Sequence, residues 1–520
     1  MKRSALLFFF GVILICNSVA ASGLRIMESM VMHSKILKQD VSFSVCLPAN
    51  YYVVKQSFPV VYLLHGLGDD EASWLEFGQI SQYADKATGT KEAVPMIFVA
   101  PQGYRTYYVN DYKGTFLYQD MFVKELVPYI DSLFRTIADR QHRAVMGYSM
   151  GGFGALILHL KHSDIFGTAV PLSISIRTDE QYKTEDASGW DDQWGRLFGE
   201  PGLKGTDRIT EYYKQNSPFH VLSQLPASMI KKLNIYIDNG DKEQTLCRSN
   251  EELHILMRNL NIPHEFRVRD GGHSFQYWCS SLSNALRFIS NAFEGNPYLG
   301  DKIINPTVLP VAEKQLKTLS VGNDQLTVFV PLEYDGTNRK YPVMYCIGTF
   351  GAKQKQSIAS VVNHEIENNN ACPMLMVFLP EKDSAALRAI ITQVEDQIRV
   401  RKGYKFRAVA GFENGAKAAF LIGMNEKQFG ICILSDGFVD KESITGIISS
   451  GKKENLKLTS YFIDAPDKGS FYEGNGNAHM LLRDKDVQHE YRVRQGSGGF
   501  EWILTGLPEI ITFSAKRFHK

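Results

Sequence analysis

The chain has 520 residues, which is too long for one ordinary domain and predicts two. With 44% hydrophobic and 12% aromatic residues, each half has enough apolar side chains to bury a core. The net charge of +1 and the pI near 7.6 argue against a basic surface that binds nucleic acid or another polyanion.

The first twenty residues have the pattern of a secretory signal. Lys2 and Arg3 precede the apolar run ALLFFFGVILIC, and Ser18-Val19-Ala20 follows it with small residues at its first and last positions. The apolar run is too short to cross a bilayer as a helix, so no membrane insertion is expected after cleavage. The pattern predicts cleavage after Ala20 and a secreted or periplasmic protein.

Apolar strands and helical stretches then alternate along the chain. VSFSVCLP (41–48) alternates like a half-buried strand, whereas PVVYLLHG (59–66) is the continuous apolar run of a fully buried one. Further strands are expected in MIFVAPQG, RAVMGYS and LNIYIDNG, with helices such as QDMFVKELVPYIDSLF and NEELHILMRNL between them. This alternation predicts an α/β fold with a mostly parallel sheet that helices cover on both faces.

A polar segment at residues 174–220 interrupts the alternation, and we interpret it as a cap insertion over one edge of the sheet. A stretch punctuated by Gly and Pro follows the first set of elements and predicts a linker. We therefore divide the chain into a signal peptide (1–20), a first domain (21–296), a linker (297–310) and a second domain (311–520).

The second half of the chain repeats the first. YPVMYCIGTFG repeats FPVVYLLHGLG, RAVAGFENGAKAAF repeats RAVMGYSMGGFGAL, and HEYRVRQGSGGFEW repeats HEFRVRDGGHSFQYW. The second copy is shorter where the first carries its polar insertion. The repeat predicts two tandem α/β domains, the second smaller and without the cap insertion.

A G-x-S-x-G motif occupies residues 147–151, between an apolar strand and a helix-like stretch. Glycines at its ends allow the sharp turn that exposes a serine hydroxyl at the edge of a sheet. A serine hydroxyl is a weak nucleophile at neutral pH and needs a general base that a carboxylate holds. The setting predicts Ser149 as a nucleophile rather than a buried core serine.

His273 lies in a Gly-rich loop after the strand EFRVRD, where the base of such a site is expected. A histidine in a loop is by itself more often a solvated side chain. In the second copy, however, Glu413 replaces Ser149 and Gly498 replaces His273. The joint loss of both residues favours His273 as the base of the first copy.

The carboxylate is expected in the turn after LNIYIDNG, where Asp241 and Glu243 both qualify by position. The oxyanion donors are expected to be the backbone amides of Met150, which follows the nucleophile, and of Leu67, which follows the first buried strand.

Four stretches, PVVYLLHGLGDDEASW, VMGYSMGGFGAL, IDNGDKEQ and RVRDGGHSFQYW, resemble the putative-esterase family of α/β-hydrolases over residues 30–293. That family includes esterase D, S-formylglutathione hydrolases, mycolyltransferases, and feruloyl and acetylxylan esterases. Its acid turn commonly reads G-x-x-D, so the resemblance implies Glu243 as the acid. Asp241 remains the alternative, because Glu here replaces the usual Asp.

The resemblance implies a first domain that is a catalytic serine esterase needing no cofactor and no metal. The second domain is expected to be a degenerate pseudo-esterase, since Gly348 also replaces His65 and Lys468 or Gly469 stands opposite Glu243.

Export makes the chain more similar to the carbohydrate esterases of this family than to its cytosolic thioester hydrolases. The expected substrate is a feruloyl ester of plant polysaccharide such as xylan. The alternatives are acetylxylan esterase or another carbohydrate deacetylase, an acyltransferase to a sugar acceptor, and a non-catalytic carbohydrate-binding protein. Aromatic faces that could stack on the substrate, or pack in the core, are expected from Trp74, Trp190, Trp194, Tyr277 and Trp278.

Six cysteines follow the predicted cleavage site, and none lies in a Cys-x-x-Cys pair, so no zinc site is expected. Export permits disulfides, although buried free thiols are an equally simple interpretation. Cys247 and Cys279 are the best candidates for a bridge, because each lies just after a loop expected to be catalytic.

Overall fold

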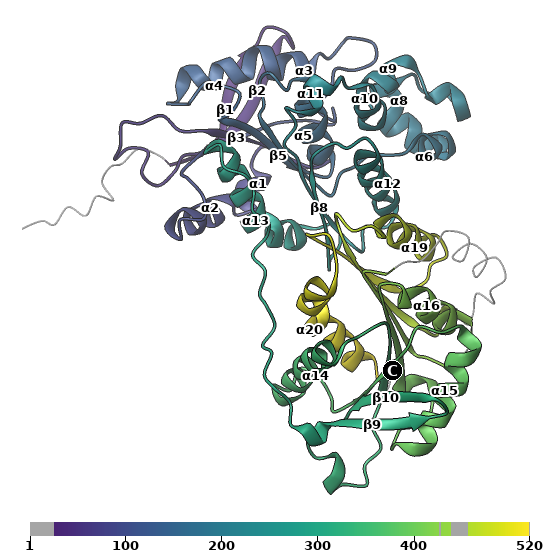
Figure 1. The fold of residues 1–520 in the computed structure, drawn as a ribbon. Helices are drawn as coiled ribbons and strands as arrows, with labels where there is room; N and C mark the ends of the chain where they lie inside the picture. Colours follow the sequence, from purple (N-terminus) through teal and green to yellow (C-terminus); the bar gives the residue numbers. More distant parts are fainter. Residues whose placement is uncertain (1–24, 426–427, 438–455, 519–520) are drawn as a thin grey trace, which may run out of the picture.

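The computed structural model describes residues 25–425, 428–437 and 456–518 (Figure 1). The predicted signal peptide, residues 1–20, lies outside the described residues. In the described part of the chain, no helix combines the length and the apolar character needed to cross a membrane.

Sixteen strands are described, eight in each half of the chain. The first eight are β1 (Ile26–Ser34), β2 (Gln39–Cys46), β3 (Val60–Leu64), β4 (Ile97–Pro101), β5 (Arg143–Tyr148), β6 (Thr168–Leu172), β7 (Tyr236–Gly240) and β8 (Glu265–Arg269). The second eight are β9 (Leu316–Val321), β10 (Asp324–Phe329), β11 (Val343–Ile347), β12 (Leu375–Leu379), β13 (Arg407–Phe412), β14 (Ile431–Ser435), β15 (Ser460–Pro466) and β16 (His489–Arg494).

All these strands belong to one sheet whose two halves have the same internal order. The order is β1-β2-β4-β3-β5-β6-β7-β8 in the first half and β9-β10-β12-β11-β13-β14-β15-β16 in the second. The halves meet where β8 and β16 pair antiparallel at Val268 and Val493. The prediction of two tandem α/β domains is therefore confirmed.

Most of the sheet is parallel. In the first half, the strands from β4 to β8 run parallel, and only the outer pair β1 and β2 is antiparallel to its neighbours. Every residue of β3 and β5 is buried. Strands that are covered on both faces need apolar side chains at successive positions, which is why PVVYLLHG has no polar alternation.

Helices cover both faces of the sheet. One apolar cluster runs along one face through both domains, and its helices are α4 (Val127–Leu133), α5 (Met150–Lys161), α12 (Thr245–Asn259), α15 (Ser384–Gln397), α16 (Gly415–Asn425) and α19 (Tyr472–Asp484). The opposite face carries α2 (Ile80–Gly89) and α13 (Phe275–Phe293) in the first domain, and α14 (Ala352–Glu367) and α20 (Phe500–Arg517) in the second. The core thus continues from one domain into the other along a single face.

The predicted cap insertion lies between β6 and β7. It holds α6 (Asp179–Thr184), α7 (Ala187–Gly189), α8 (Gly195–Phe198), α9 (Glu211–Asn216), α10 (Pro218–Gln224) and α11 (Ala227–Ile230). The equivalent connection in the second domain, between β14 and β15, spans only residues 436–459. The second domain is smaller for this reason.

All six described cysteines are free thiols, so of the two interpretations left open the free thiols are correct, and Cys247 and Cys279 are not bridged. Cys247 lies on α12 and Cys279 on α13, and these helices cover opposite faces of the sheet. The Cys279 Sγ lies 3.6 Å from the carbonyl oxygen of Gly78. Burial raises the pKa of the Cys247 thiol to about 12.

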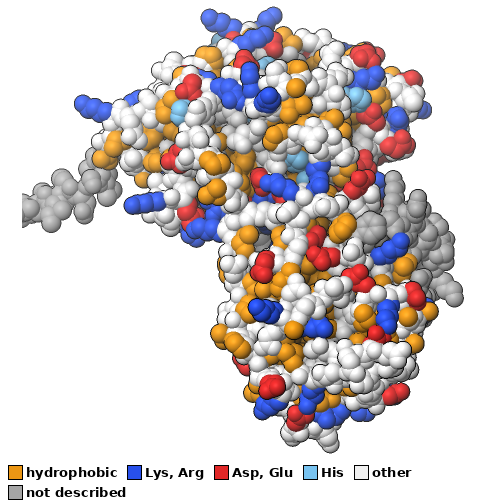
Figure 2. Space-filling model, viewed as in Figure 1, with side chains coloured by type: hydrophobic (Ala, Val, Ile, Leu, Met, Phe, Trp, Pro, Cys, Tyr) orange, Lys and Arg blue, Asp and Glu red, His pale blue; other side chains and the backbone are white. Residues whose placement is uncertain are grey.

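On the face shown in Figure 2, acidic and basic side chains are intermixed over both domains. This distribution agrees with the net charge of +1.

Candidate active site

Ser149 occupies a sharp turn between β5 and α5, with φ 57° and ψ −118°. A residue other than glycine rarely adopts such a backbone, and its surroundings must hold it there. The Ser149 amide donates to the carbonyl of Leu172 at 3.0 Å, and its carbonyl accepts from the amide of Ser175 at 3.0 Å. The end of β6 therefore holds the strained turn.

The glycines of the motif let α5 start directly against the sheet. A Cβ on Gly147 would overlap the backbone of Gly151, and a Cβ on Gly151 would overlap the carbonyl oxygen of Leu64 on β3. Only glycine fits at these two positions. The close packing forces the chain to reverse at Ser149, which places the hydroxyl at the carboxyl edge of the sheet.

The structure brings Ser149, His273 and Glu243 together. The Ser149 Oγ lies 2.9 Å from His273 Nε2, and His273 Nδ1 lies 3.2 Å from Glu243 Oε2. The three residues follow β5, β8 and β7, which are parallel strands whose carboxyl ends lie at one edge of the sheet. The side chain of His273 is 38% exposed, whereas that of Glu243 is 1% exposed.

Hydrogen bonds fix which oxygen of Glu243 faces His273. The other oxygen, Oε1, accepts from the Gly240 amide at 2.9 Å and from the Ser173 hydroxyl. The Ser173 hydroxyl in turn accepts from the indole N–H of Trp278 at 2.7 Å. This chain of donors leaves Oε2 free to face the imidazole.

Asp241, the alternative acid, has other partners. Its Oδ2 accepts from Arg492 Nη1 at 2.6 Å and from the Tyr491 amide at 3.2 Å, and its Oδ1 accepts from the Gly271 amide at 3.1 Å. Burial raises the pKa of the Asp241 carboxyl, and the positive charge of Arg492 opposes that rise. Glu243, rather than Asp241, is the carboxylate that contacts the histidine.

The two amides expected to bind an oxyanion lie at the ends of β3 and β5. Met150 is the first residue of α5, where an amide has no acceptor within the helix. Leu67 follows Gly66, whose carbonyl accepts from His65 Nδ1 at 2.7 Å. Because this carbonyl and the Leu67 N–H belong to one peptide unit, the His65 ring orients the Leu67 donor.

The His65 ring is held as a neutral donor and acceptor. Its Nε2 accepts from the Gly103 amide at 2.7 Å while Nδ1 donates to Gly66, and burial lowers the pKa of the ring. In the second domain Gly348 takes this position, so the same peptide unit lacks that support.

The five aromatic side chains expected to contact substrate are all buried, with at most 5% exposed: Trp74, Trp190, Trp194, Tyr277 and Trp278. A buried ring offers no face to a sugar or an aromatic acid, so this expectation is corrected. Trp74 donates to the carbonyl of Leu64 at 3.1 Å, and Trp190 donates to the carbonyl of Glu200 at 2.9 Å. Trp74 and Trp190 therefore hold backbone segments by hydrogen bonds.

Two other aromatic residues, the exposed Phe77 and the partly buried Phe275, lie near the loop of His273. Phe77 is 58% exposed, and its ring centroid lies 5.5 Å from that of Phe275. The Phe275 ring lies 4.9 Å from that of Tyr148, which directly precedes Ser149. The sequence carried little signal for this pair, because single phenylalanines in loops are more often part of the core.

The second domain keeps the turn but lacks the serine and the histidine. Glu413 has φ 50°, and its amide donates to the carbonyl of Ser435 at 3.2 Å, as Ser149 does to Leu172. A Cβ on Gly498, the counterpart of His273, would overlap the carboxylate of Asp436. An acidic side chain therefore fills the space where the first domain holds its imidazole.

The chain is similar to known proteins over part of its length. Residues 34–289 match the model of the family described as "Putative esterase". An esterase of Mycobacterium tuberculosis is 29% identical over 251 residues, which are 45% of this chain and 52% of that protein. The chain thus spans about half the length of the curated relatives that it matches first.

Two further relatives match part of the chain. The acetyl esterase of Caldicellulosiruptor saccharolyticus is 24% identical over 272 residues, which are 50% of this chain and 96% of that protein. The endo-1,4-beta-xylanase/feruloyl esterase of Xylanibacter ruminicola is 35% identical over 135 residues, 24% of this chain and 18% of that protein. With the family model matching throughout its α/β core, the first domain of this chain belongs to the Putative esterase family.

Proposed function

We propose that the chain is a serine carboxylic-ester hydrolase in which Ser149 is the nucleophile, His273 the general base and Glu243 the carboxylate that holds it. The contact of 2.9 Å between Ser149 Oγ and His273 Nε2, on a turn that exposes the hydroxyl, carries this proposal. Glu243 completes the order of groups that such catalysis needs.

The mechanism follows from the hydrogen-bond roles. A carboxylate only accepts, so the proton of the neutral imidazole is on Nδ1, which leaves Nε2 to accept from the Ser149 hydroxyl. As Oγ attacks the ester carbonyl carbon, His273 takes the hydroxyl proton, and the Glu243 carboxylate stabilises the imidazolium.

The amides of Leu67 and Met150 would donate to the oxyanion of the tetrahedral intermediate. The protonated His273 then gives its proton to the leaving alcohol, and the C–O bond breaks to leave an acyl group on Ser149. Water, deprotonated by the same imidazole, attacks the acyl carbon and releases the acid, which regenerates the free serine.

We propose feruloyl esters of plant polysaccharide as the substrate. The exposed ring of Phe77, packed against the partly buried Phe275 two residues after His273, supplies apolar, aromatic surface that a ferulate ring would contact. One relative carries a feruloyl esterase name. Acetyl esters of xylan are the second candidate, because the acetyl esterase relative aligns over 96% of its own length.

A substrate screen that includes a variant of Ser149 tests both the serine mechanism and the choice of substrate. The full chain and Ser149→Ala are assayed on methyl ferulate, acetylated xylan and p-nitrophenyl acetate. We expect release of ferulate, and a kcat lower by about 10³-fold or more in the variant. Release of acetate from acetylated xylan without release of ferulate from methyl ferulate would make acetyl esters, rather than feruloyl esters, the substrate. Near-normal turnover by the variant would overturn the serine mechanism.

We also propose that residues 1–20 direct export and that the second domain, residues 311–520, is a pseudo-esterase. The Lys2-Arg3 start and the apolar run support the first statement, and Glu413 and Gly498 support the second. Mass spectrometry of protein from the periplasm or the medium should give a mature chain that begins at Ala21. An uncleaved N-terminus there would contradict export by this signal.

A further inference from the structure

At the junction, each domain contributes one arginine that contacts an aspartate of the other domain. Arg267 on β8 and Arg492 on β16 hold equivalent positions in the repeated sequence HE(F/Y)RVR. Arg267 Nη1 donates to Asp467 Oδ2 at 2.6 Å, and Arg492 Nη1 donates to Asp241 Oδ2 at 2.6 Å. All four side chains are buried, so each pair is a strong link that is shielded from solvent.

Asp241 ties the loop of Glu243 to the loop of His273. Its amide donates to the Arg269 carbonyl at 2.9 Å, and its Oδ1 accepts from the Gly271 amide at 3.1 Å. Each of these loops carries its catalytic group two residues further on, Glu243 after Asp241 and His273 after Gly271. A displacement of Asp241 would therefore change the distance between Glu243 and His273.

The second domain holds Asp241 at three points. The Arg492 guanidinium and the Tyr491 amide donate to its carboxylate, and the Arg483 guanidinium donates to its carbonyl oxygen. We propose that Arg492 is a positioning residue for the ester hydrolysis of the first domain, because through Asp241 it maintains the contact between Glu243 and His273. The inference rests on the proposed function.

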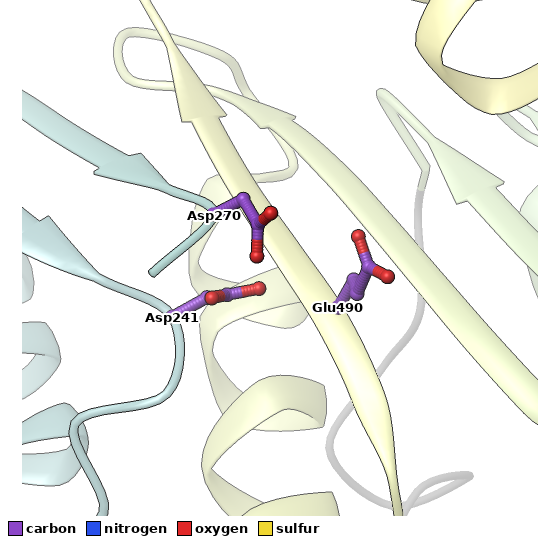
Figure 3. Close-up of side chains that lie close together, drawn as sticks. All are labelled: Asp241, Asp270 and Glu490. Atoms are coloured by element: carbon purple, nitrogen blue, oxygen red, sulfur yellow. The ribbon is translucent and has the colours of Figure 1, made fainter. Parts of the chain in front are cut away.

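The charges around Asp241 make this role specific to Arg492. Figure 3 shows Asp241 and Asp270 of the first domain close to Glu490 of β16. One carboxylate oxygen from each of the three lies within 4.8 Å of the others. Arg492 contacts both Asp241 and Glu490, and Lys242 contacts Asp270. Without Arg492, the buried Asp241 carboxylate would face two like charges without its own cation, so its turn would have to move.

The second domain contains a matched control. Asp467 donates from its amide to the Arg494 carbonyl at 2.8 Å, and its Oδ1 accepts from the Gly496 amide at 2.8 Å, as Asp241 does in its own loops. The residues that follow, however, are Gly469 and Gly498, which carry no catalytic group. Breaking this second pair removes an equivalent link between the domains and leaves the triad untouched.

The test compares Arg492→Gln with Asp467→Asn in the full chain, since each breaks one of the two pairs and both lie outside the catalytic domain. The readouts are kcat and KM for p-nitrophenyl acetate, the rate at which a fluorophosphonate labels Ser149, and Tm. We expect Arg492→Gln to lower kcat and the labelling rate by about 10- to 100-fold, with a much smaller change in KM. Asp467→Asn should change both rates by less than about twofold.

A double variant separates positioning from general loss of structure. If Arg492 acts through the contact between Glu243 and His273, adding Arg492→Gln to Glu243→Gln should cost little more than Glu243→Gln alone. If Arg492→Gln instead destabilised the whole fold, it would lower the rate by the same factor in the parent chain and in Glu243→Gln. That result would overturn the proposal. Equal effects of Arg492→Gln and Asp467→Asn on the two rates would also overturn it.

A conservative variant covers the case in which Arg492→Gln does not fold. Arg492→Lys keeps the positive charge, and we expect it to recover part of the lost rate while Asp467→Asn stays near the parent value. Activity that persists in Ser149→Ala would refute the proposed function itself. Normal rates in the Arg492 variants, with an inactive Ser149→Ala, would refute only the positioning role.

Discussion

Ser149 and Glu413 occupy the same backbone position in the two domains. Their φ angles are 57° and 50°, and their amides donate to the ends of the neighbouring strands at 3.0 and 3.2 Å. The second domain therefore retains a strained turn although its side chain cannot act as a serine nucleophile. The turn exists because a helix packs tightly against the sheet, and the catalysis that we propose for the first domain would use a geometry that packing already requires.

The glycines after these turns should be equally necessary to both domains. A Cβ on Gly151 would overlap the Leu64 carbonyl, and a Cβ on Gly415 would overlap the Ile347 carbonyl. We expect Gly151→Ala and Gly415→Ala each to destabilise its own domain by about 1–3 kcal/mol or more. Urea unfolding with a probe for each domain measures this. A neutral effect at Gly415 would show that the second turn can relax.

Placing a serine on the second turn should not create a second active site. Gly498 supplies no imidazole, and the Asp436 carboxylate fills the space next to it. In Glu413→Ser, a fluorophosphonate should therefore label the chain once, on Ser149, since a hydroxyl without a base is a weak nucleophile. Peptide mass spectrometry locates the label, and the double variant Ser149→Ala, Glu413→Ser should remain unlabelled. A phosphonylated residue at position 413 would contradict the pseudo-esterase interpretation.

Glu243→Gln should be more damaging than Asp241→Asn. Glu243 contacts His273 Nδ1, whereas Asp241 contacts the second domain and the Gly271 amide. A glutamine cannot stabilise the imidazolium, so we expect kcat to fall by about 10²- to 10⁴-fold. Asp241→Asn keeps an oxygen that can accept from Gly271, so its loss should be at least about tenfold smaller. Steady-state kinetics on p-nitrophenyl acetate rank the two, and the reverse order would assign the acid to Asp241.

The contact between Ser149 and His273 could be predicted from sequence because each part has a local signal. The strand, the G-x-S-x-G motif and the following helix are contiguous, and so are the strand EFRVRD and the loop of His273. These patterns depend on backbone geometry within a few residues. Each survives in the second copy even where the side chain has changed, which made the replacement of Ser149 and His273 visible.

No pattern in the neighbouring sequence could decide whether Asp241 or Glu243 is the acid that contacts His273. Both lie in one turn, and what separates them is the contact of Asp241 with Arg492, a residue 251 positions away. The burial of Trp190 and Trp194 depends in the same way on how the cap insertion folds back on itself, where Trp194 stacks on Phe198. Pairing between β8 and β16 creates the junction, and an alternating apolar pattern does not specify a partner strand.

Glu251 gives the junction a dependence on pH. It lies on α12 and accepts from the hydroxyls of Tyr472 and Tyr491, both in the second domain. Burial raises the pKa of its carboxyl from an ordinary value of 4.5 to about 7. Between these values the folded chain holds a proton that the unfolded chain has lost, so stability falls as the pH rises through this window.

Glu251→Gln should therefore stabilise the protein above pH 7 and have little effect near pH 4. A glutamine oxygen can still accept from the two tyrosine hydroxyls and never ionises, so we expect a gain of about 3 kcal/mol at pH 8. The measurement is the free energy of unfolding in urea at several pH values. The control is Glu252→Gln, a partly exposed neighbour that pairs with Arg248, which should change stability by less than about 1 kcal/mol. A gain for Glu251→Gln that is the same at pH 4 and pH 8 would show that ionisation of this carboxyl is not its cause.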